Sequence, residues 1–65
     1  MINKEAYIKK ISKYSLSQLY YNLNDCEEAI RINPNNPKNN DYSDEINYII
    51  EVINKKQYGI DINKY

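Results

Sequence analysis

The stretch that decides the fold is Asn33-Pro34-Asn35-Asn36-Pro37-Lys38-Asn39-Asn40-Asp41, in the middle of a chain of 65 residues. Its two prolines and five asparagines cannot continue a helix, because proline lacks a backbone N–H donor and asparagine side chains compete for backbone groups in turns. Segments with apolar residues at helical spacing lead into this stretch and out of it. We therefore expect residues 33–41 to be the loop of an antiparallel helical hairpin.

The segment before the loop has the clearest helical pattern, and we expect a helix over about residues 16–32. Ser15 and Gln18 fit a capping box, in which each side chain binds the backbone N–H of the other residue. Apolar side chains repeat at the three-and-four spacing of a helix-packing seam, at Leu16, Leu19, Leu23, Cys26 and Ile30.

A short first helix is expected over about residues 4–13, with Asn3 as its N-cap and with Ile8 and Ile11 one turn apart. Isolated helices of this length are marginal in water, so this one must pack against another element. The alternative is one continuous, bent helix over residues 4–32.

A third helix is expected after the loop, over about residues 42–58. Asp41 or Ser43 is its predicted N-cap. Asp44 and Glu45 would then lie in its first turn, where negative side chains interact favourably with the helix dipole.

Gly59 is the single glycine of the chain and is expected to end the third helix in a left-handed conformation. Beyond it, Ile60 and Ile62 alternate with polar residues, so residues 59–65 are expected to form an extended tail that lies against a neighbour or is frayed. Residues 1–65 are thus expected to form one small all-α domain, a short helix followed by a helical hairpin.

The third helix carries more apolar surface than one partner helix covers, because an amphipathic stripe is only about 100° wide. Tyr48 and Val52 lie on a different side from the main stripe, and Ile50 is next to it. The surplus must face the first helix, another copy or a ligand. A chain this short buries only about 60% of its surface, and its single cysteine excludes an intrachain disulfide. We therefore expect a homo-oligomer. The main stripe consists of Tyr42, Ile46, Ile49 and Ile53.

The composition argues against catalysis and metal binding. The chain has no histidine, one cysteine and one glycine. This excludes Ser-His and Cys-His pairs, zinc sites built from several such ligands, and a glycine-rich phosphate loop. We expect no enzymatic activity, no metal and no cofactor.

Charge and hydropathy narrow the possible partners. The net charge is zero, which argues against nucleic acid as a partner, and the four lysines of residues 1–13 have no arginine among them for reading bases. No apolar run approaches the roughly 20 residues that cross a bilayer, so we expect no membrane contact. The lone cysteine fits a reducing cytoplasm. The richness in Asn, Ile, Lys and Tyr suggests an AT-rich coding genome, such as that of a low-GC bacterium or its phages, so we expect the cytoplasm of a bacterial host.

Eight tyrosines without phenylalanine or tryptophan are the unusual feature of the composition. A tyrosine has an apolar ring with a polar tip and is favoured at interfaces and stacking surfaces. Two tyrosines that flank the loop are candidates for stacking on a base, two cations for binding phosphate, and two asparagines for polar edges. Arg31 is also placed to pair with Glu27. The six predicted ligand-binding residues are Arg31, Asn36, Lys38, Asn40, Tyr42 and Tyr48.

Two resemblances accompany this pattern. The sequence Glu-Ala-Ile-Arg-Ile-Asn-Pro-Asn-Asn-Pro of residues 28–37 resembles the end of a tetratricopeptide repeat. That likeness covers about a dozen residues, and the small and aromatic positions of the family's first helix fall on lysines at Lys9, Lys10 and Lys13.

A longer resemblance runs from Leu23 to Tyr48, through Asn33-Pro34, Asn36-Pro37-Lys38 and Tyr42-Ser43-Asp44-Glu45-Ile46-Asn47-Tyr48. This pattern resembles short phage-encoded helical proteins of no settled function. The resemblance implies a phage accessory protein that counters host immunity, either by sequestering a nucleotide signal or by occluding a defence protein.

Two functional hypotheses follow. The first is an oligomeric sponge that sequesters a cyclic nucleotide or an ADP-ribose-type signal without catalysis. The second is a helical protein that inhibits a host defence protein by direct binding, in the manner of an anti-CRISPR, or a structural adaptor. In this second case, acidic residues of the third helix would face a basic surface, namely Asp41, Asp44, Glu45 and Glu51.

Overall fold

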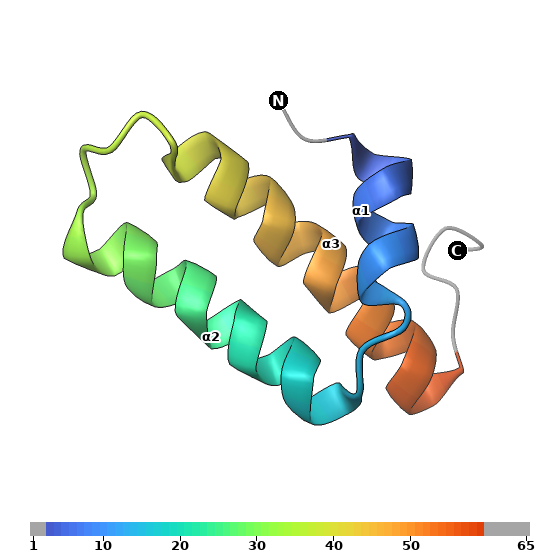
Figure 1. Ribbon diagram of the computed structural model, residues 1–65. Coiled ribbons are helices and arrows are strands. Elements are labelled where there is room, and N and C mark those ends of the chain that lie inside the picture. Colours follow the sequence, from blue (N-terminus) through green and yellow to red (C-terminus); the bar gives the residue numbers. More distant parts are fainter. Residues whose placement is uncertain (1–2, 60–65) are drawn as a thin grey trace.

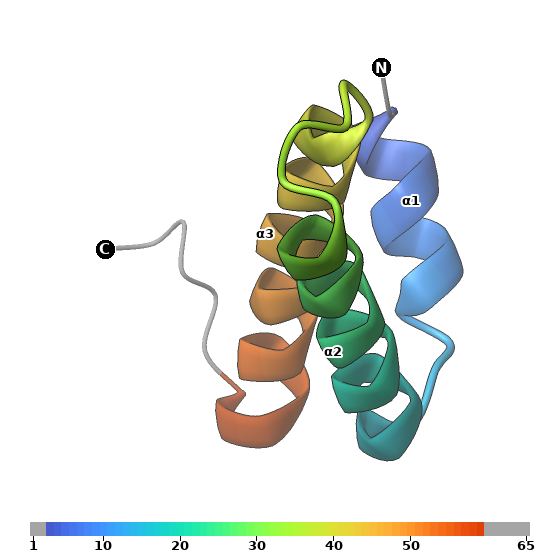
Figure 2. The same ribbon diagram turned by 90° about the vertical axis from the view of Figure 1, so that its left-hand side faces the viewer.

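The computed structural model describes residues 3–59 and is all-helical (Figure 1). Helix α2 and helix α3 form a long antiparallel hairpin, and the short helix α1 packs against α3 on one side of it (Figures 1 and 2). The helices have the bounds α1 (Lys4–Ile11), α2 (Leu16–Ile32) and α3 (Asn39–Tyr58). The predicted order of a short helix followed by a hairpin is confirmed.

Helix α1 begins as expected, because the side chain of Asn3 accepts a hydrogen bond from the backbone N–H of Ala6 at 3.1 Å. It ends at Ile11, two residues before the predicted end. The backbone N–H of Ser12 makes the last i→i−4 bond, to the carbonyl of Ile8 at 2.9 Å, and the Ser12 hydroxyl donates to the same carbonyl at 2.6 Å. The next N–H groups, of Lys13 and Tyr14, bond only three residues back. The chain then turns away before α2.

The capping box at the start of α2 is confirmed. The backbone N–H of Ser15 donates to Oε1 of Gln18 at 2.9 Å, and the backbone N–H of Gln18 donates to Oγ of Ser15 at 3.2 Å. This reciprocal pair fixes Ser15 in an extended conformation. Helices α1 and α2 are therefore separate, and the alternative of one bent helix is not observed.

The loop is shorter than predicted, because α3 begins at Asn39 rather than near residue 42. Asparagine side chains close the loop within residues 33–38. Oδ1 of Asn36 accepts from the backbone N–H of Lys38 at 2.9 Å, and Nδ2 of Asn39 donates to the carbonyl of Asn33 at 2.9 Å. The side chains of Asn36 and Asn39 thus close the loop and allow α3 to begin at Asn39.

The start of α3 corrects the predicted cap. Lys38 is the N-cap residue and makes no side-chain capping bond, so neither Asp41 nor Ser43 caps the helix. Asp41 is the acidic residue of the first turn of α3, whereas Asp44 and Glu45, predicted for that turn, lie in the second. At the other end, the backbone N–H of Gly59 donates to the carbonyl of Lys55 at 3.0 Å, with a φ of 67° at the glycine, as expected.

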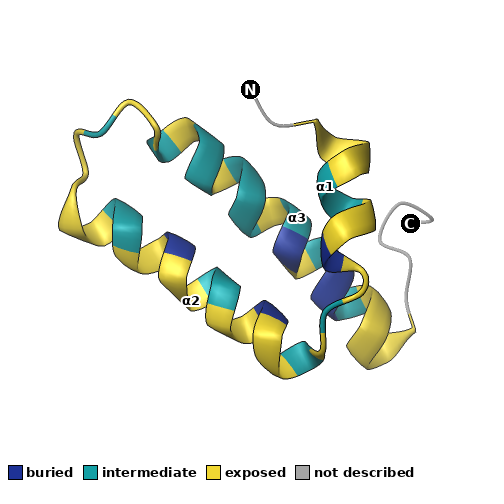
Figure 3. Cartoon of the chain, viewed as in Figure 1, coloured by how far each residue is buried: buried dark blue, intermediate teal, exposed yellow. Residues whose placement is uncertain are grey.

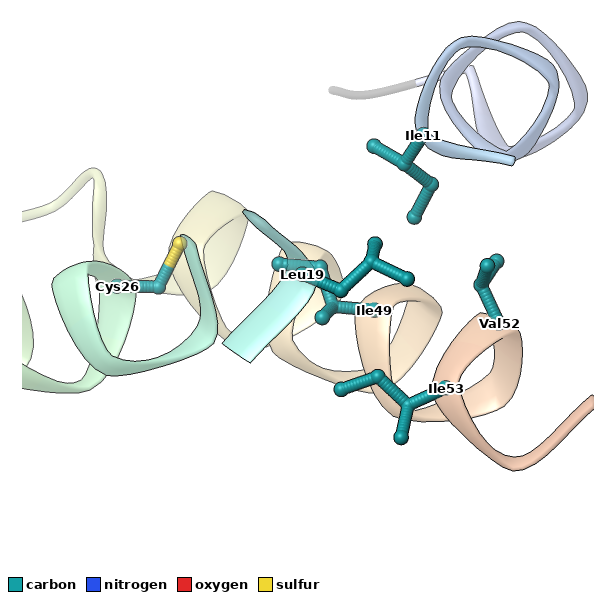
Figure 4. Packing of buried hydrophobic residues seen from close by; sticks show 6 residues of the cluster. All are labelled: Ile11, Leu19, Cys26, Ile49, Val52 and Ile53. Atoms are coloured by element: carbon teal, nitrogen blue, oxygen red, sulfur yellow. The ribbon is translucent and has the colours of Figure 1, made fainter. Parts of the chain in front are cut away.

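The core lies where the three helices meet (Figures 3 and 4). Ile11, Leu19 and Ile49 come one from each helix and are completely buried. The other buried side chains of the described residues are Cys26, Val52 and Ile53. Figure 4 shows the side chain of Ile11 pointing from α1 toward the side chains of α2 and α3.

Helix α1 covers much of the predicted apolar surplus of α3. Val52 is only 4% exposed, and the ring of Tyr48 lies 6.0 Å from that of Tyr7 on α1. Ile50 remains 40% exposed. A single copy therefore buries most of the apolar side of α3 that was expected to contact another subunit. The homo-oligomer stays a prediction, which now rests on the exposed Ile50 and its surroundings.

None of the described helices is both long and apolar enough to cross a bilayer. The predicted extended tail is represented among the described residues by Gly59 alone, so the alternating Ile60 and Ile62 lie outside them.

Candidate functional site

A pocket of about 360 Å³ lies between α1 and the first two turns of α3. Tyr7 supplies the α1 side. The other lining residues recur every three or four positions and so share one face of α3; they are Lys38, Asp41, Tyr42 and Glu45. Two aromatic rings, one cation and two carboxylates therefore border a single space.

The hydroxyl of Tyr7 on α1 lies near the carboxylate of Glu45 on α3 and can donate a hydrogen bond to it. Burial raises the pKa of Tyr7 well above its ordinary value, and the hydrogen bond to Glu45 raises it further. Tyr7 is therefore protonated at neutral pH and donates to Glu45, which keeps its ring in place at the pocket.

Tyr48 lies behind Tyr7 and holds α1 against α3. Its ring lies 6.0 Å from that of Tyr7, at an interplanar angle of 52°. Nζ of Lys4 lies 5.8 Å from the centroid of the Tyr48 ring and 3.7 Å from the carboxylate of Glu51. Tyr48 thus contributes to helix docking and does not line the pocket, although it was predicted as a stacking residue.

Two of the six predicted ligand-binding residues, Lys38 and Tyr42, line the same pocket. Asn36 is a loop-closing residue, because its side-chain carbonyl accepts from the backbone N–H of Lys38. Asn40 is exposed and is not among the lining residues.

Arg31 is placed elsewhere, on the exposed surface of α2. Its Nη2 lies 3.6 Å from the carboxylate of Glu28, one turn away, rather than pairing with Glu27 as predicted. Arg31 borders a different depression, together with three other α2 residues, Asn24, Glu27 and Glu28. It therefore does not share the pocket of Lys38 and Tyr42.

The sequence analysis missed Tyr7 as a site residue. The pattern of residues 4–13 gives no signal that this helix reaches the start of α3. Asp41 and Glu45 were predicted to lie at the start of the third helix or to contact a protein partner, whereas both line the tyrosine pocket.

Cys26 is buried in the core and plays no part in the pocket's chemistry. Burial, followed by the negative charge of Glu45, raises the pKa of its thiol to about 11. A thiol that is protonated at neutral pH is a poor nucleophile. This agrees with the prediction that Cys26 is a small apolar core residue.

Comparison of the chain with protein-family models, curated proteins and solved structures gives no match. Its resemblance to phage-encoded helical proteins therefore rests on the residues quoted above alone. Function is inferred here from the pocket and the chemistry of its residues.

Proposed function

We propose that this chain is a non-catalytic binding protein that holds a nucleotide-derived small molecule between α1 and α3. The observation that supports this best is the meeting of Lys38 and Tyr42, both predicted from the sequence, with Tyr7 in one pocket. The volume of about 360 Å³ falls within the range of small-molecule sites.

The residues suggest how such a ligand would bind. The rings of Tyr7 and Tyr42 offer faces on which a base can stack. Lys38 would pair with a phosphate, which the positive end of the α3 dipole also favours because Lys38 is the N-cap residue. The carboxylates of Asp41 and Glu45 would accept hydrogen bonds from ribose hydroxyls or base amino groups.

The biological setting follows from the phage resemblance. The proposed role is an anti-defence sponge in the cytoplasm of a bacterial host, which sequesters a cyclic nucleotide or an ADP-ribose-type signal. Its proposed homo-oligomeric form would use the hairpin surface that α1 leaves open, where Tyr20 and Ile50 are exposed. Light scattering should then give a molar mass that is a multiple of the 7.8 kDa protomer.

Isothermal titration calorimetry with cyclic dinucleotides and ADP-ribose tests the proposal. The wild-type chain should release or absorb heat with at least one of them. Tyr42→Ala should raise the Kd about tenfold through lost stacking, and Lys38→Gln should weaken binding in a salt-dependent way. Arg31→Gln is the matched control, because it removes a cation outside the pocket. Absence of binding to every compound would contradict the proposal.

A second candidate is suggested by the two carboxylates, Asp41 and Glu45, that line the pocket among the described residues. Asp41 and Glu45 beside two tyrosine rings would suit an arginine or lysine side chain of a protein partner. The chain would then inhibit a defence protein by direct binding.

Asp41→Asn separates the two candidates, because it removes a negative charge at the pocket. Binding of a nucleotide should be kept or strengthened, whereas binding of an arginine-rich peptide should weaken several-fold. Calorimetry with both probes measures the sign of each change. A peptide that binds the variant as tightly as the wild type would reject the second candidate.

A further inference from the structure

Positive charge gathers at the end of the molecule opposite the loop. The end of α1, the start of α2 and the end of α3 all lie toward this end, with the ends of α1 and α3 on either side of α2 in Figure 2. No aspartate or glutamate occurs from Ala6 to Asn24. The segments of this end carry five lysines, Lys9, Lys10, Lys13, Lys55 and Lys56. The net charge of zero thus conceals a strongly basic region.

A groove of about 500 Å³ opens at this end, beside the first turns of α2. Tyr14 from the α1–α2 connection and Tyr21 from α2 both line it. Tyr21 is 74% exposed, so most of its surface is open to a ligand, whereas Tyr14 is half-buried and also packs against the core. The remaining lining residues are uncharged and polar, namely Ser17, Gln18 and Asn22.

The capping box gives the groove a defined hydrogen-bonding character. Oε1 of Gln18 already accepts hydrogen bonds from the backbone N–H and the hydroxyl of Ser15, at 2.9 and 3.3 Å. The amide of Gln18 therefore has its N–H donors left for a ligand. Ser17 and Asn22 can both donate and accept, which suits the varied edges of unpaired bases.

We propose that this basic, tyrosine-lined end binds single-stranded nucleic acid. Bases would stack on Tyr14 and Tyr21, the polar residues of the groove would contact base edges, and the surrounding lysines would neutralise phosphates. A cationic surface combined with exposed aromatic rings is the usual arrangement for sequence-tolerant binding of single strands. This site is separate from the pocket at the α1–α3 contact and does not depend on its function.

The chemistry favours a single strand over a duplex. Tyrosine rings need unstacked bases, which a duplex does not present. The absence of arginine from α1 argues against the reading of bases in a duplex, and the net charge of zero describes the whole chain rather than this end. Neither point opposes stacking of unpaired bases at one basic end.

Fluorescence anisotropy with a labelled oligothymidylate of about 12 nucleotides, at about 20 mM salt, tests this inference. The wild-type chain should bind the single strand and bind a duplex of the same length more weakly. Tyr21→Ala should raise the Kd about tenfold, whereas Tyr21→Phe should bind nearly as the wild type, because it keeps the ring that stacks.

Replacing Lys9, Lys10 and Lys13 with glutamine should make the negative slope of log K for association against log salt concentration shallower by about two. Each phosphate contact to a single strand contributes about 0.7 to the magnitude of this slope. Arg31→Gln is the matched control, because it removes an exposed cation that lines neither the groove nor the α1–α3 pocket, and it should leave oligonucleotide binding unchanged. Circular dichroism checks that every variant remains helical.

Several results would overturn the inference. These are no binding at low salt, equal binding by Tyr21→Ala and the wild type, or a duplex bound as tightly as the single strand. Binding to vesicles of anionic phospholipid without binding to the oligonucleotide would assign the basic end to membranes instead. An effect of Arg31→Gln equal to that of the triple lysine variant would show that binding does not depend on the lysines of the basic end.

Discussion

Helix α3 has two helical neighbours, and they hold it in different ways. Helix α2 runs antiparallel to α3 along the hairpin and places Leu19 and Cys26 in the core. Helix α1 has eight residues and contributes one buried side chain, Ile11. Its other contacts to α3 include the ion pair of Lys4 with Glu51 at 3.7 Å. The α2–α3 contact also has a polar component, because the hydroxyl of Tyr20 donates to Oε1 of Gln57 at 2.6 Å.

This difference matters because the candidate pocket spans the weaker of the two contacts. The hairpin supplies four of its lining residues, and α1 supplies Tyr7. A helix of eight residues is not stable alone, so the pocket exists only while α1 is docked. A ligand that touches both Tyr7 and Tyr42 should therefore stabilise the docked state.

The largest predicted effect is on the hairpin contact. Leu19→Ala should lower the free energy of unfolding by about 3 kcal/mol, because it leaves a cavity at a fully buried site. A domain of this size is stable by only about 3–10 kcal/mol, so much of the chain should unfold. Urea denaturation followed by circular dichroism measures the change. Leu16→Ala, at a half-buried position of the same helix, is the control and should cost less.

A smaller and more local effect is expected at the α1 contact. Ile11→Ala should cost about 2 kcal/mol and release α1, while α2 and α3 stay paired. Hydrogen exchange should show lost protection in α1 and retained protection around Leu19 and Ile49. If the amides of all three helices lost protection together, the two contacts would form one cooperative unit, contrary to the distinction drawn above.

The smallest effect is expected from the hydrogen bond across the pocket. Tyr7→Phe removes the hydroxyl that donates to Glu45 and should cost about 1 kcal/mol. Tyr14→Phe, which removes a hydroxyl elsewhere, is the control and should be nearly neutral.

The same hydrogen bond gives a pH dependence. The pKa of Tyr7 is raised in the folded chain, so the unfolded chain loses this proton first as the pH passes the ordinary value of 10.0. Stability should be unaffected by Tyr7 below that pH and should fall above it. This fall should be shallower for Tyr7→Phe than for the wild type when Tm is measured from neutral to alkaline pH. Identical slopes would contradict the stated role of the hydroxyl.

Features set by local chemistry were predictable from the sequence. The cap at Asn3, the capping box of Ser15 and Gln18, and the end of α3 at Gly59 all depend on residues within one turn of each other. These interactions use neighbouring backbone groups, so the sequence alone specifies them.

The start of α3 was not predicted correctly, because asparagine can either break a helix or close the loop that leads into one. Asparagine was interpreted as a helix breaker throughout residues 33–41, yet Asn36 and Asn39 close the loop and let the helix begin at Asn39. The turn propensity of asparagine correctly indicated a loop in this stretch. It did not indicate the residue at which the loop ends and α3 begins.

The candidate site was only half predictable for a different reason. Lys38 and Tyr42 lie four residues apart, so their shared face follows from helix geometry. The contribution of Tyr7 depends on how α1 packs against α3, which is a long-range contact without a local signal. Arg31 was predicted as a site residue because it is close to the loop in the sequence. It lies on the exposed surface of α2, outside the pocket.

The most direct test of the central claim is an NMR titration of the labelled wild-type chain with cyclic di-AMP and with ADP-ribose. Ligand binding at the α1–α3 contact predicts amide shifts that cluster at Tyr7, Lys38, Asp41, Tyr42 and Glu45, and that disappear in Tyr42→Ala. Shifts confined to Arg31 and the outer face of α2, or no shifts with either compound, would contradict the assignment of this pocket as the nucleotide site.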